Sequence, residues 1–294
     1  MSGLSRTWAV TRYELTWDLR KRRTYLVVGL ILLASFYFAY LTPLIFGKSI
    51  TAERTLLGIS FGSDFWWVNT IFQVFSLFVS GLFPLLIGGV IAADSLATEF
   101  DKNTITPLLS QPVRRLEVYA GKFFGKFLIL LAVSVLFTLM TIGFSEVSLG
   151  AQANLNMVPL VVLAELGAFL EFAAIGFFLG SLPRSGSMVF GLLLGLLFGV
   201  VWTVLLIGFQ FGIQEPLSLL PVSNAVFLLQ VVPYYVFQPW GVMVIQGIAL
   251  GAYTQQVVVT VVSAMEYALT GLMVNLTAFL VAGYYIFRRA EVKG

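Results

Sequence analysis

The sequence predicts an all-α polytopic membrane protein with six transmembrane helices. Hydrophobic residues make up 59% of the 294 residues and charged residues only 11%, whereas a soluble domain carries about 25% charged residues. Several apolar runs exceed the roughly 20 residues that a helix needs to cross a bilayer. We therefore expect residues 1–294 to form a single transmembrane domain.

Two missing residue types exclude several function classes. The chain contains no Cys and no His. Their absence excludes disulfide frameworks, thiolate chemistry and Cys-based metal sites, and also zinc protease, Ser–His nucleophile and haem-ligand sites. We expect no metal site. An intramembrane enzyme would need an acidic pair or a Ser–Lys dyad in the bilayer, and the predicted spans favour neither.

Residues 1–23 are expected to form a helix that lies in the membrane interface. Charged side chains occupy most of its surface, which is typical of interfacial helices that keep one apolar stripe. A basic cluster at 20–23 precedes the first predicted span and anchors it. The residues that share the stripe are Leu4, Trp8, Thr11, Leu15 and Leu19.

Basic residues predict the orientation of the six spans. Of the 17 Lys and Arg residues, six precede the first span, five lie in 94–126, one is Arg184 and three follow the last span. Only Lys48 and Arg54 fall on the other side. The positive-inside rule therefore places both termini and the segment 94–122 in the cytoplasm. The spans are expected at about 24–46, 65–93, 123–144, 159–182, 188–211 and 265–287.

The segment 212–264 has two interpretations. It carries no charge from Pro216 to Met265, and four prolines interrupt it. Such a stretch is consistent with re-entrant or interfacial helices on the extracellular side, or with an additional pair of spans. Pro-broken backbone at membrane depth survives only where protein or a water-filled cavity covers it.

The segment 94–122 reads DSLATEFDKNTITPLLSQPVRRLEVYAGK, and its pattern resembles the loop between spans 2 and 3 of type-2 ABC transporter permeases, the ABC-2 export family. Departures from the family pattern are Asn103, Ile105 and Pro107. Asn tolerates the left-handed backbone that a Gly would supply, so the first departure is mild. The matching residues are Glu99, Thr104, Leu108, Leu109, Pro112, Val113, Arg115, Gly121 and Lys122.

The resemblance implies a membrane-spanning permease subunit of an ATP-driven exporter. Such permeases have an interfacial elbow helix, six spans, cytosolic termini and extracellular helices before the last span. Two copies, identical or paralogous, pair as a dimer in the cell membrane of a prokaryote. Separate cytosolic ATPase subunits hold the Mg-ATP. This chain has no ATP-binding motif, so we expect it to be no enzyme and to hold no cofactor. Its small net charge of +3 reflects basic loops and not a nucleic-acid surface, so we expect it to bind no nucleic acid.

The physical properties of the segment 94–122 fit a coupling role. Thr104 is suited to cap a short helix, Pro107 falls in its first turn, and Pro112 ends it. The apolar face of this helix would dock into a groove of the ATPase, with charged residues around it. The expected coupling residues are Glu99, Asp101, Thr104, Ile105, Leu108, Leu109, Arg114 and Arg115.

Polar residues within the predicted spans are candidates for the substrate pathway. Charged side chains at mid-bilayer are costly, so they usually face a cavity or a partner. Glu165 and Glu171 are six residues apart, which separates them by about 120° around a helix and puts them on different faces. Hydrogen-bonded structural roles are the alternative. The candidates are Glu171, Glu165, Glu266 and Asn275.

Three glycines in the fifth span predict close helix packing. Gly191, Gly195 and Gly199 repeat at four-residue spacing, which lets another helix approach closely. We expect this face to contribute to the permease dimer interface, with packing inside one subunit as the alternative. For the whole chain, the alternative function is a channel or secondary transporter that works without ATP, and internal inverted repeats would favour it.

Overall fold

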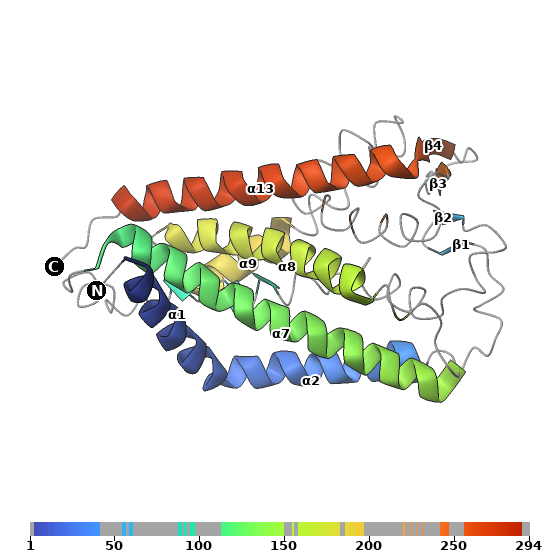
Figure 1. Ribbon diagram of the computed structural model, residues 1–294, viewed down its shortest axis with the longest axis horizontal. Helices are drawn as coiled ribbons and strands as arrows, with labels where there is room; N and C mark the ends of the chain where they lie inside the picture. The colour runs from blue at the N-terminus through green and yellow to red at the C-terminus, as the bar shows by residue number, and fades with distance from the viewer. Residues whose placement is uncertain are drawn as a thin grey trace.

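The computed structural model confirms the helical fold class (Figure 1). Its helices are separated in sequence by segments that lie outside the described residues. The structure describes residues 3–41, 55–56, 59–60, 88–89, 91–92, 95–97, 113–149, 155, 158–182, 186–196, 220, 224, 228, 231, 242–246 and 256–289.

Among the described residues, six α-helices have defined bounds. The second, α2, ends in a π-helical turn, η1, at Tyr37–Leu41. The α-helices are α1 (Gly3–Leu19), α2 (Arg22–Phe36), α7 (Arg115–Leu149), α8 (Val158–Ser181), α9 (Gly186–Leu196) and α13 (Val261–Arg289).

Four helical stretches among the described residues are long and apolar enough to cross a membrane: Thr24–Leu41, Arg115–Phe144, Val158–Ser181 and Val262–Arg289. They correspond to the first, third, fourth and sixth spans that the sequence predicts. The second predicted span lies largely outside the described residues, and α9 covers only the start of the fifth. The count of six therefore stays a prediction.

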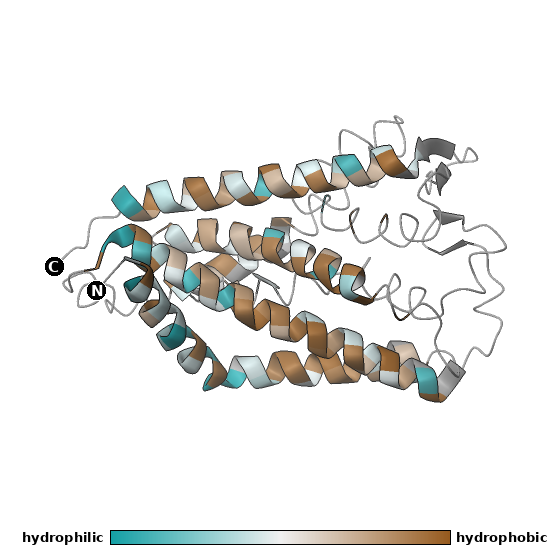
Figure 2. Ribbon diagram, in the orientation of Figure 1, coloured by the Kyte–Doolittle hydropathy of each residue, from teal (hydrophilic) through white to brown (hydrophobic). Residues whose placement is uncertain are grey.

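The long helices run along the longest axis of the molecule, and both chain ends lie at the same end of it (Figure 1). α2 and α7 lead away from that end, whereas α8 and α13 return to it. Hydrophobic residues cover the middle of these helices, and hydrophilic residues gather near the chain ends (Figure 2). This arrangement agrees with the predicted alternation of the spans.

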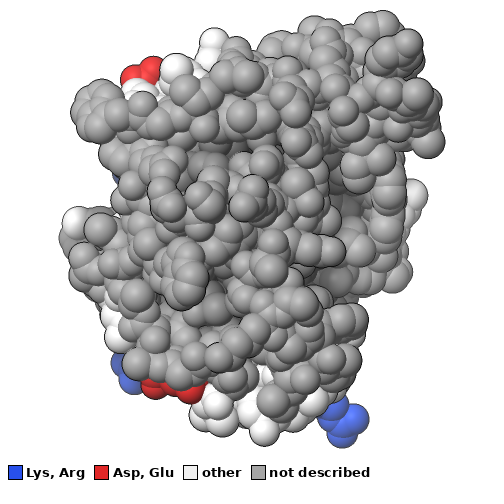
Figure 3. Space-filling view, turned by 90° about the vertical axis from the view of Figure 1, so that its right-hand side faces the viewer, with Lys and Arg blue, Asp and Glu red and all other residues white. Residues whose placement is uncertain are grey.

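A small antiparallel sheet at the opposite end was not predicted. Its strand order is β1-β2-β3-β4, and Ile59 of β2 pairs with Ile245 of β3. Viewed from this end, the described charged side chains that come into sight lie near the margins (Figure 3). The strands are β1 (Thr55–Leu56), β2 (Ile59–Ser60), β3 (Val242–Gln246) and β4 (Gln256–Thr260).

The expectation of helices throughout 212–264 was therefore wrong for the residues of β3 and β4. These strands read VMVIQ and QVVVT, and β-branched residues fit a pleated sheet better than a helix. The two strands pair along their whole length, with Val244 opposite Val258. Pairing of the two strands satisfies their backbone N–H and C=O groups without a helix.

The core lies between α7, α8 and α13. α8 supplies closely spaced buried side chains, among them Phe169, Phe172 and Phe177. Near the chain ends, the Tyr119 ring of α7 packs edge-on against Phe177, with ring centroids 5.5 Å apart, and its hydroxyl donates to the Leu280 carbonyl oxygen of α13 at 3.1 Å. One tyrosine thus connects the three helices.

Candidate functional site

The two ends of the segment 94–122 are described, whereas its middle is not. The predicted coupling residues Glu99, Asp101, Thr104, Ile105, Leu108 and Leu109 lie outside the described residues. At its end the structure differs from the expected loop, because α7 begins at Arg115 rather than near 123. The Glu117 carboxylate accepts the Arg114 backbone N–H at 2.9 Å. Glu117 lies in the first turn of α7, and this contact caps the N-terminus of that helix.

Arg115 attaches the start of α7 to the end of α13. Its guanidinium donates to the carbonyl oxygen of Arg288 at 2.6 Å and to that of Phe287 at 3.4 Å. The last carbonyls of a helix lack partners within the helix, and a cation suits the negative end of the helix dipole. Arg115 is half-buried, whereas Arg114 is exposed. Arg114 therefore remains the more accessible of the two predicted coupling arginines.

Buried charges join α1 to α7, and the sequence did not predict this contact. Lys122 donates to a Glu14 carboxylate oxygen at 2.9 Å, and the Lys126 amine lies 3.2 Å from the other one. Lys126 also pairs with Asp18, which in turn accepts a hydrogen bond from Lys21 at 2.8 Å. Glu14, Asp18, Lys122 and Lys126 are all buried.

Ser95 connects this cluster to the start of the segment 94–122. Its hydroxyl donates to Glu14 at 2.8 Å, and Lys122 donates to its carbonyl oxygen at 3.4 Å. Burial alone would raise the pKa of Glu14. The charges of Lys126 and Lys122, together with hydrogen bonds from Lys122 and Ser95, instead lower the pKa from 4.5 to about 2. Glu14 is therefore a carboxylate at neutral pH.

The spacing of these residues was the signal that could have revealed the contact. Glu14 and Asp18 are four residues apart, and so are Lys122 and Lys126. Residues four apart share one face of a helix. α1 therefore presents two acidic side chains and α7 two basic ones, at the same spacing. The charges of residues 1–23 were expected to lie off the apolar stripe, and the structure brings two of them, Glu14 and Asp18, against α7.

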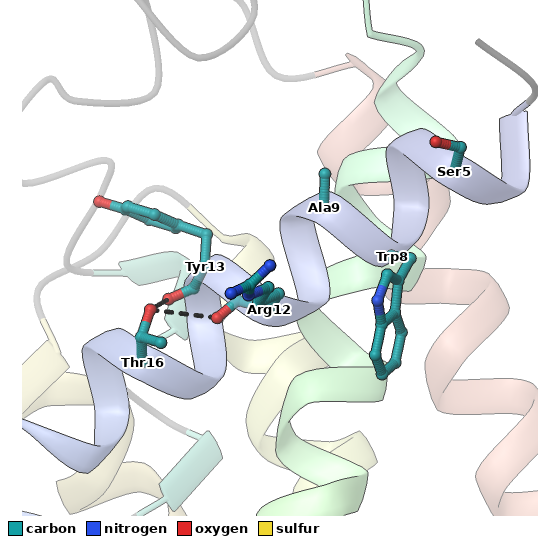
Figure 4. A pocket seen from close by; sticks show the side chains of 6 residues that line it. All are labelled: Ser5, Trp8, Ala9, Arg12, Tyr13 and Thr16. Atoms are coloured by element: carbon teal, nitrogen blue, oxygen red, sulfur yellow. Dashed lines mark hydrogen bonds between the residues drawn. The ribbon is translucent and has the colours of Figure 1, made fainter.

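The outward face of α1 carries a pocket of about 460 Å³. Figure 4 shows the Arg12 side chain between the rings of Trp8 and Tyr13. Leu4, Trp8 and Leu19 of the predicted stripe are exposed, but Thr11 is buried and donates to the Gly121 carbonyl oxygen at 3.0 Å. The predicted stripe is therefore interrupted by a contact with α7. The pocket is lined by Ser5, Trp8, Ala9, Arg12, Tyr13 and Thr16.

Of the four predicted pathway residues, the structure brings two together. The Asn275 amide of α13 donates to Glu171 of α8 at 3.0 Å, and both side chains are buried. Glu165 faces α7 instead, where the Thr138 hydroxyl donates to it at 3.3 Å. Glu266 is exposed at the start of α13. Glu165 and Glu171 thus lie on different faces, as predicted.

Two of the three glycines lie on an open face of α9. A Cβ atom built on Gly191 or on Gly195 would meet no atom within 4 Å among the described residues. Gly199 lies outside the described residues. The predicted dimer contact stays a prediction, and the described part of this face has room for a closely packed partner.

Comparison with known proteins identifies the family. A family model described as ABC-2 family transporter protein matches residues 8–292. A search of curated proteins found no match. The matched range includes all of the helices described above except the first residues of α1, and it supports the resemblance seen in the segment 94–122. The chain therefore belongs to the ABC-2 family of transporter proteins.

Proposed function

We propose that this chain is the permease of an ATP-driven exporter and that a separate ABC ATPase binds its segment 94–122. The family makes the chain a membrane component of an ABC transporter. Export is the direction that the family resemblance implies. The permease would provide the path through the bilayer, and ATP hydrolysis would take place in the partner.

The observation that supports this role best is the attachment of both ends of the segment to the rest of the chain. Ser95 and Lys122 contact the same carboxylate, that of Glu14, and Arg115 contacts the end of α13. A loop that receives force from a partner needs firm attachment at both ends, because a loosely held loop would move without moving the helices.

The position of the segment fits an intracellular partner. Its described ends, 95–97 and 113–122, lie with the start of α1 and the end of α13 at the end of the molecule where hydrophilic residues gather (Figure 2). We place this end in the cytoplasm, where ATP is available. The opposite end, which carries the sheet, would face outside the cell.

The transporter would contain two permease copies, identical or paralogous. One copy offers four described candidate spans, and the open glycine face of α9 supplies a surface for the second. The Glu171–Asn275 contact then lies in the helix layer that would border the pathway, and we propose that these residues contribute to its polar lining.

Co-purification with the ABC ATPase encoded beside this gene tests the proposal. We expect a stable complex in detergent that the double substitution Leu108→Asp/Leu109→Asp dissolves, because charge on the docking face opposes its burial in an apolar groove. Val147→Asp is the matched control, since Val147 is exposed near the far end of α7. Its complex should remain intact.

The other outcomes are equally informative. A complex that resists Leu108→Asp/Leu109→Asp would keep the transporter but place the contact elsewhere on the permease. A permease that binds no ABC ATPase would contradict the proposal, and a channel or secondary transporter that works without ATP would become the better interpretation.

A further inference from the structure

The buried charges between α1 and α7 form a connected unit, which we call the α1 clamp. It consists of Glu14 and Asp18 of α1, Lys122 and Lys126 of α7, and Ser95. Two carboxylates face two ammonium groups, so the charges of the four ionic side chains balance. No residue of this set is more than 4% exposed.

Burial on this scale needs an explanation beyond stability. Removing charges from water is expensive, and a buried ion pair often stabilises a protein no more than apolar residues of the same size would. In this protein the pairing favours one arrangement of the two helices, because a shift of α1 along α7 would leave a buried charge without its counterpart. The α1 clamp is therefore suited to hold α1 in a single register on α7.

The clamp also reaches both ends of the segment 94–122. One oxygen of Glu14 accepts from Ser95, at the start of the segment, and the other accepts from Lys122, at its end. Lys122 in addition donates to the Ser95 carbonyl oxygen. The Glu14 side chain of α1 thus holds the two ends of the segment 94–122 together.

We propose that the α1 clamp makes α1 and the two ends of the segment 94–122 one mechanical unit, so that ATPase engagement of the segment is passed to α1. Glu14, Asp18, Lys122 and Lys126 are then positioning residues for energy coupling. This inference rests on the proposed function, because it takes the segment as the docking site of the ATPase.

The test measures whether α1 moves with α7. The full chain contains no Cys, so Leu4→Cys on α1 and Leu139→Cys on α7 place two spin labels at exposed positions. Pulsed EPR then gives the distance between the labels in nanodiscs with the bound ATPase, without nucleotide and with ATP and vanadate. ATP hydrolysis by the same complexes is measured in parallel.

We expect one narrow distance that nucleotide does not change when the clamp is intact. Glu14→Gln leaves two buried ammonium groups against one carboxylate, so the distribution of label distances should broaden. The rate of ATP hydrolysis by the bound ATPase should then no longer depend on the permease. Glu14→Gln/Lys122→Met balances the charges again and should restore both properties. Glu146→Gln, at an exposed site near the end of α7, is the control and should behave like the unsubstituted chain.

Three results would overturn the inference. A label distance that changes with nucleotide in the intact clamp would show that α1 and α7 move separately. A Glu14→Gln variant with a narrow distribution and full control of ATP hydrolysis would show that the clamp is not needed. A restored distance without restored control of hydrolysis would leave the clamp a structural contact alone.

Failure of the proposed function gives a different result. If no ABC ATPase binds the unsubstituted permease, the proposed function and the coupling role both fall. If the ATPase binds and responds to the permease, but the response does not depend on the clamp, only the coupling role of the clamp is overturned.

Discussion

Gly121 of α7 lies directly against the backbone of α1 at Thr7. A Cβ atom added to Gly121 would stand 2.8 Å from the Thr7 carbonyl oxygen and 2.8 Å from the Val10 Cβ atom. The next residue, Lys122, reaches Glu14. The Gly-Lys pair that ends the segment 94–122 thus has two physical roles, since the glycine admits α1 and the lysine binds it.

Gly121→Ala should therefore loosen the contact between α1 and α7. The added methyl group would meet backbone and a β-branched side chain, neither of which moves easily, and overpacking of this kind costs about 1–3 kcal/mol. Thermal unfolding of the purified chain measures the loss. Gly143→Ala is the control on the same helix, because a Cβ atom there would meet nothing within 4 Å among the described residues. Equal stability of the two variants would contradict the close contact at Gly121.

The contact between Glu171 and Asn275 makes a second prediction. Asn275→Asp would place a carboxyl group where the amide donates to Glu171 at 3.0 Å. Losing a buried hydrogen bond costs about 1–3 kcal/mol, and more where charge is left. In Glu171→Gln/Asn275→Asp, the donor and acceptor exchange places, so we expect stability to recover. Unfolding measurements on the two single variants and the double variant give the coupling energy, and a value near zero would show that the contact does not matter.

The open glycine face of α9 makes a third prediction, about self-association. Gly195→Leu should weaken the permease dimer, because a bulky side chain keeps a second helix from approaching. Cross-linking in membranes and mass photometry in nanodiscs measure the dimer fraction. Gly29→Leu is the matched control, since a Cβ atom at Gly29 also meets nothing within 4 Å among the described residues. A dimer that tolerates Gly195→Leu would assign this face to contacts within one subunit.

Much of the fold could be predicted because a membrane imposes simple rules. Span length and apolar content follow from the thickness of the bilayer, and four of the predicted spans appear as helices, with the start of α7 the largest departure from the expected bounds. The start of α7 was missed because Arg115 to Lys122 is polar enough to look like a loop. Polar side chains of this stretch instead form hydrogen bonds and ion pairs with neighbouring helices, and the hydropathy of a sequence does not reveal such contacts.

The candidate site was harder to predict for the same reason. Glu171 and Asn275 are 104 residues apart in sequence, and only their shared polarity within apolar spans suggested that they act together. The α1 clamp was missed because the charges of residues 1–23 were considered only as the polar surface of an interfacial helix. Helix spacing alone places Glu14 and Asp18 on one face, but it does not say that two lysines of a distant helix will face them.

The last prediction concerns pH. The pKa of Glu14 is lowered from 4.5 to about 2 in the folded chain, so its ion pairs stabilise the contact between α1 and α7 fully above pH 4.5. That contribution should decline as the pH falls from 4.5 towards 2, where Glu14 takes up a proton and leaves Lys122 and Lys126 with less negative charge nearby. Between pH 5 and pH 8, roughly the range in which proteins are most stable, we expect no change from this group.

Spin labels at Leu4→Cys and Leu139→Cys measure this pH dependence directly. The distance distribution should stay narrow at neutral pH and broaden progressively below pH 4.5. Glu14→Gln is the control, because an amide cannot titrate and its distribution should already be broad at neutral pH. Asp18 pairs with Lys126 and Lys21 in the same cluster, so Asp18→Asn separates its contribution. A distribution that first broadens well above pH 4.5 would show that another group, and not Glu14, controls the contact.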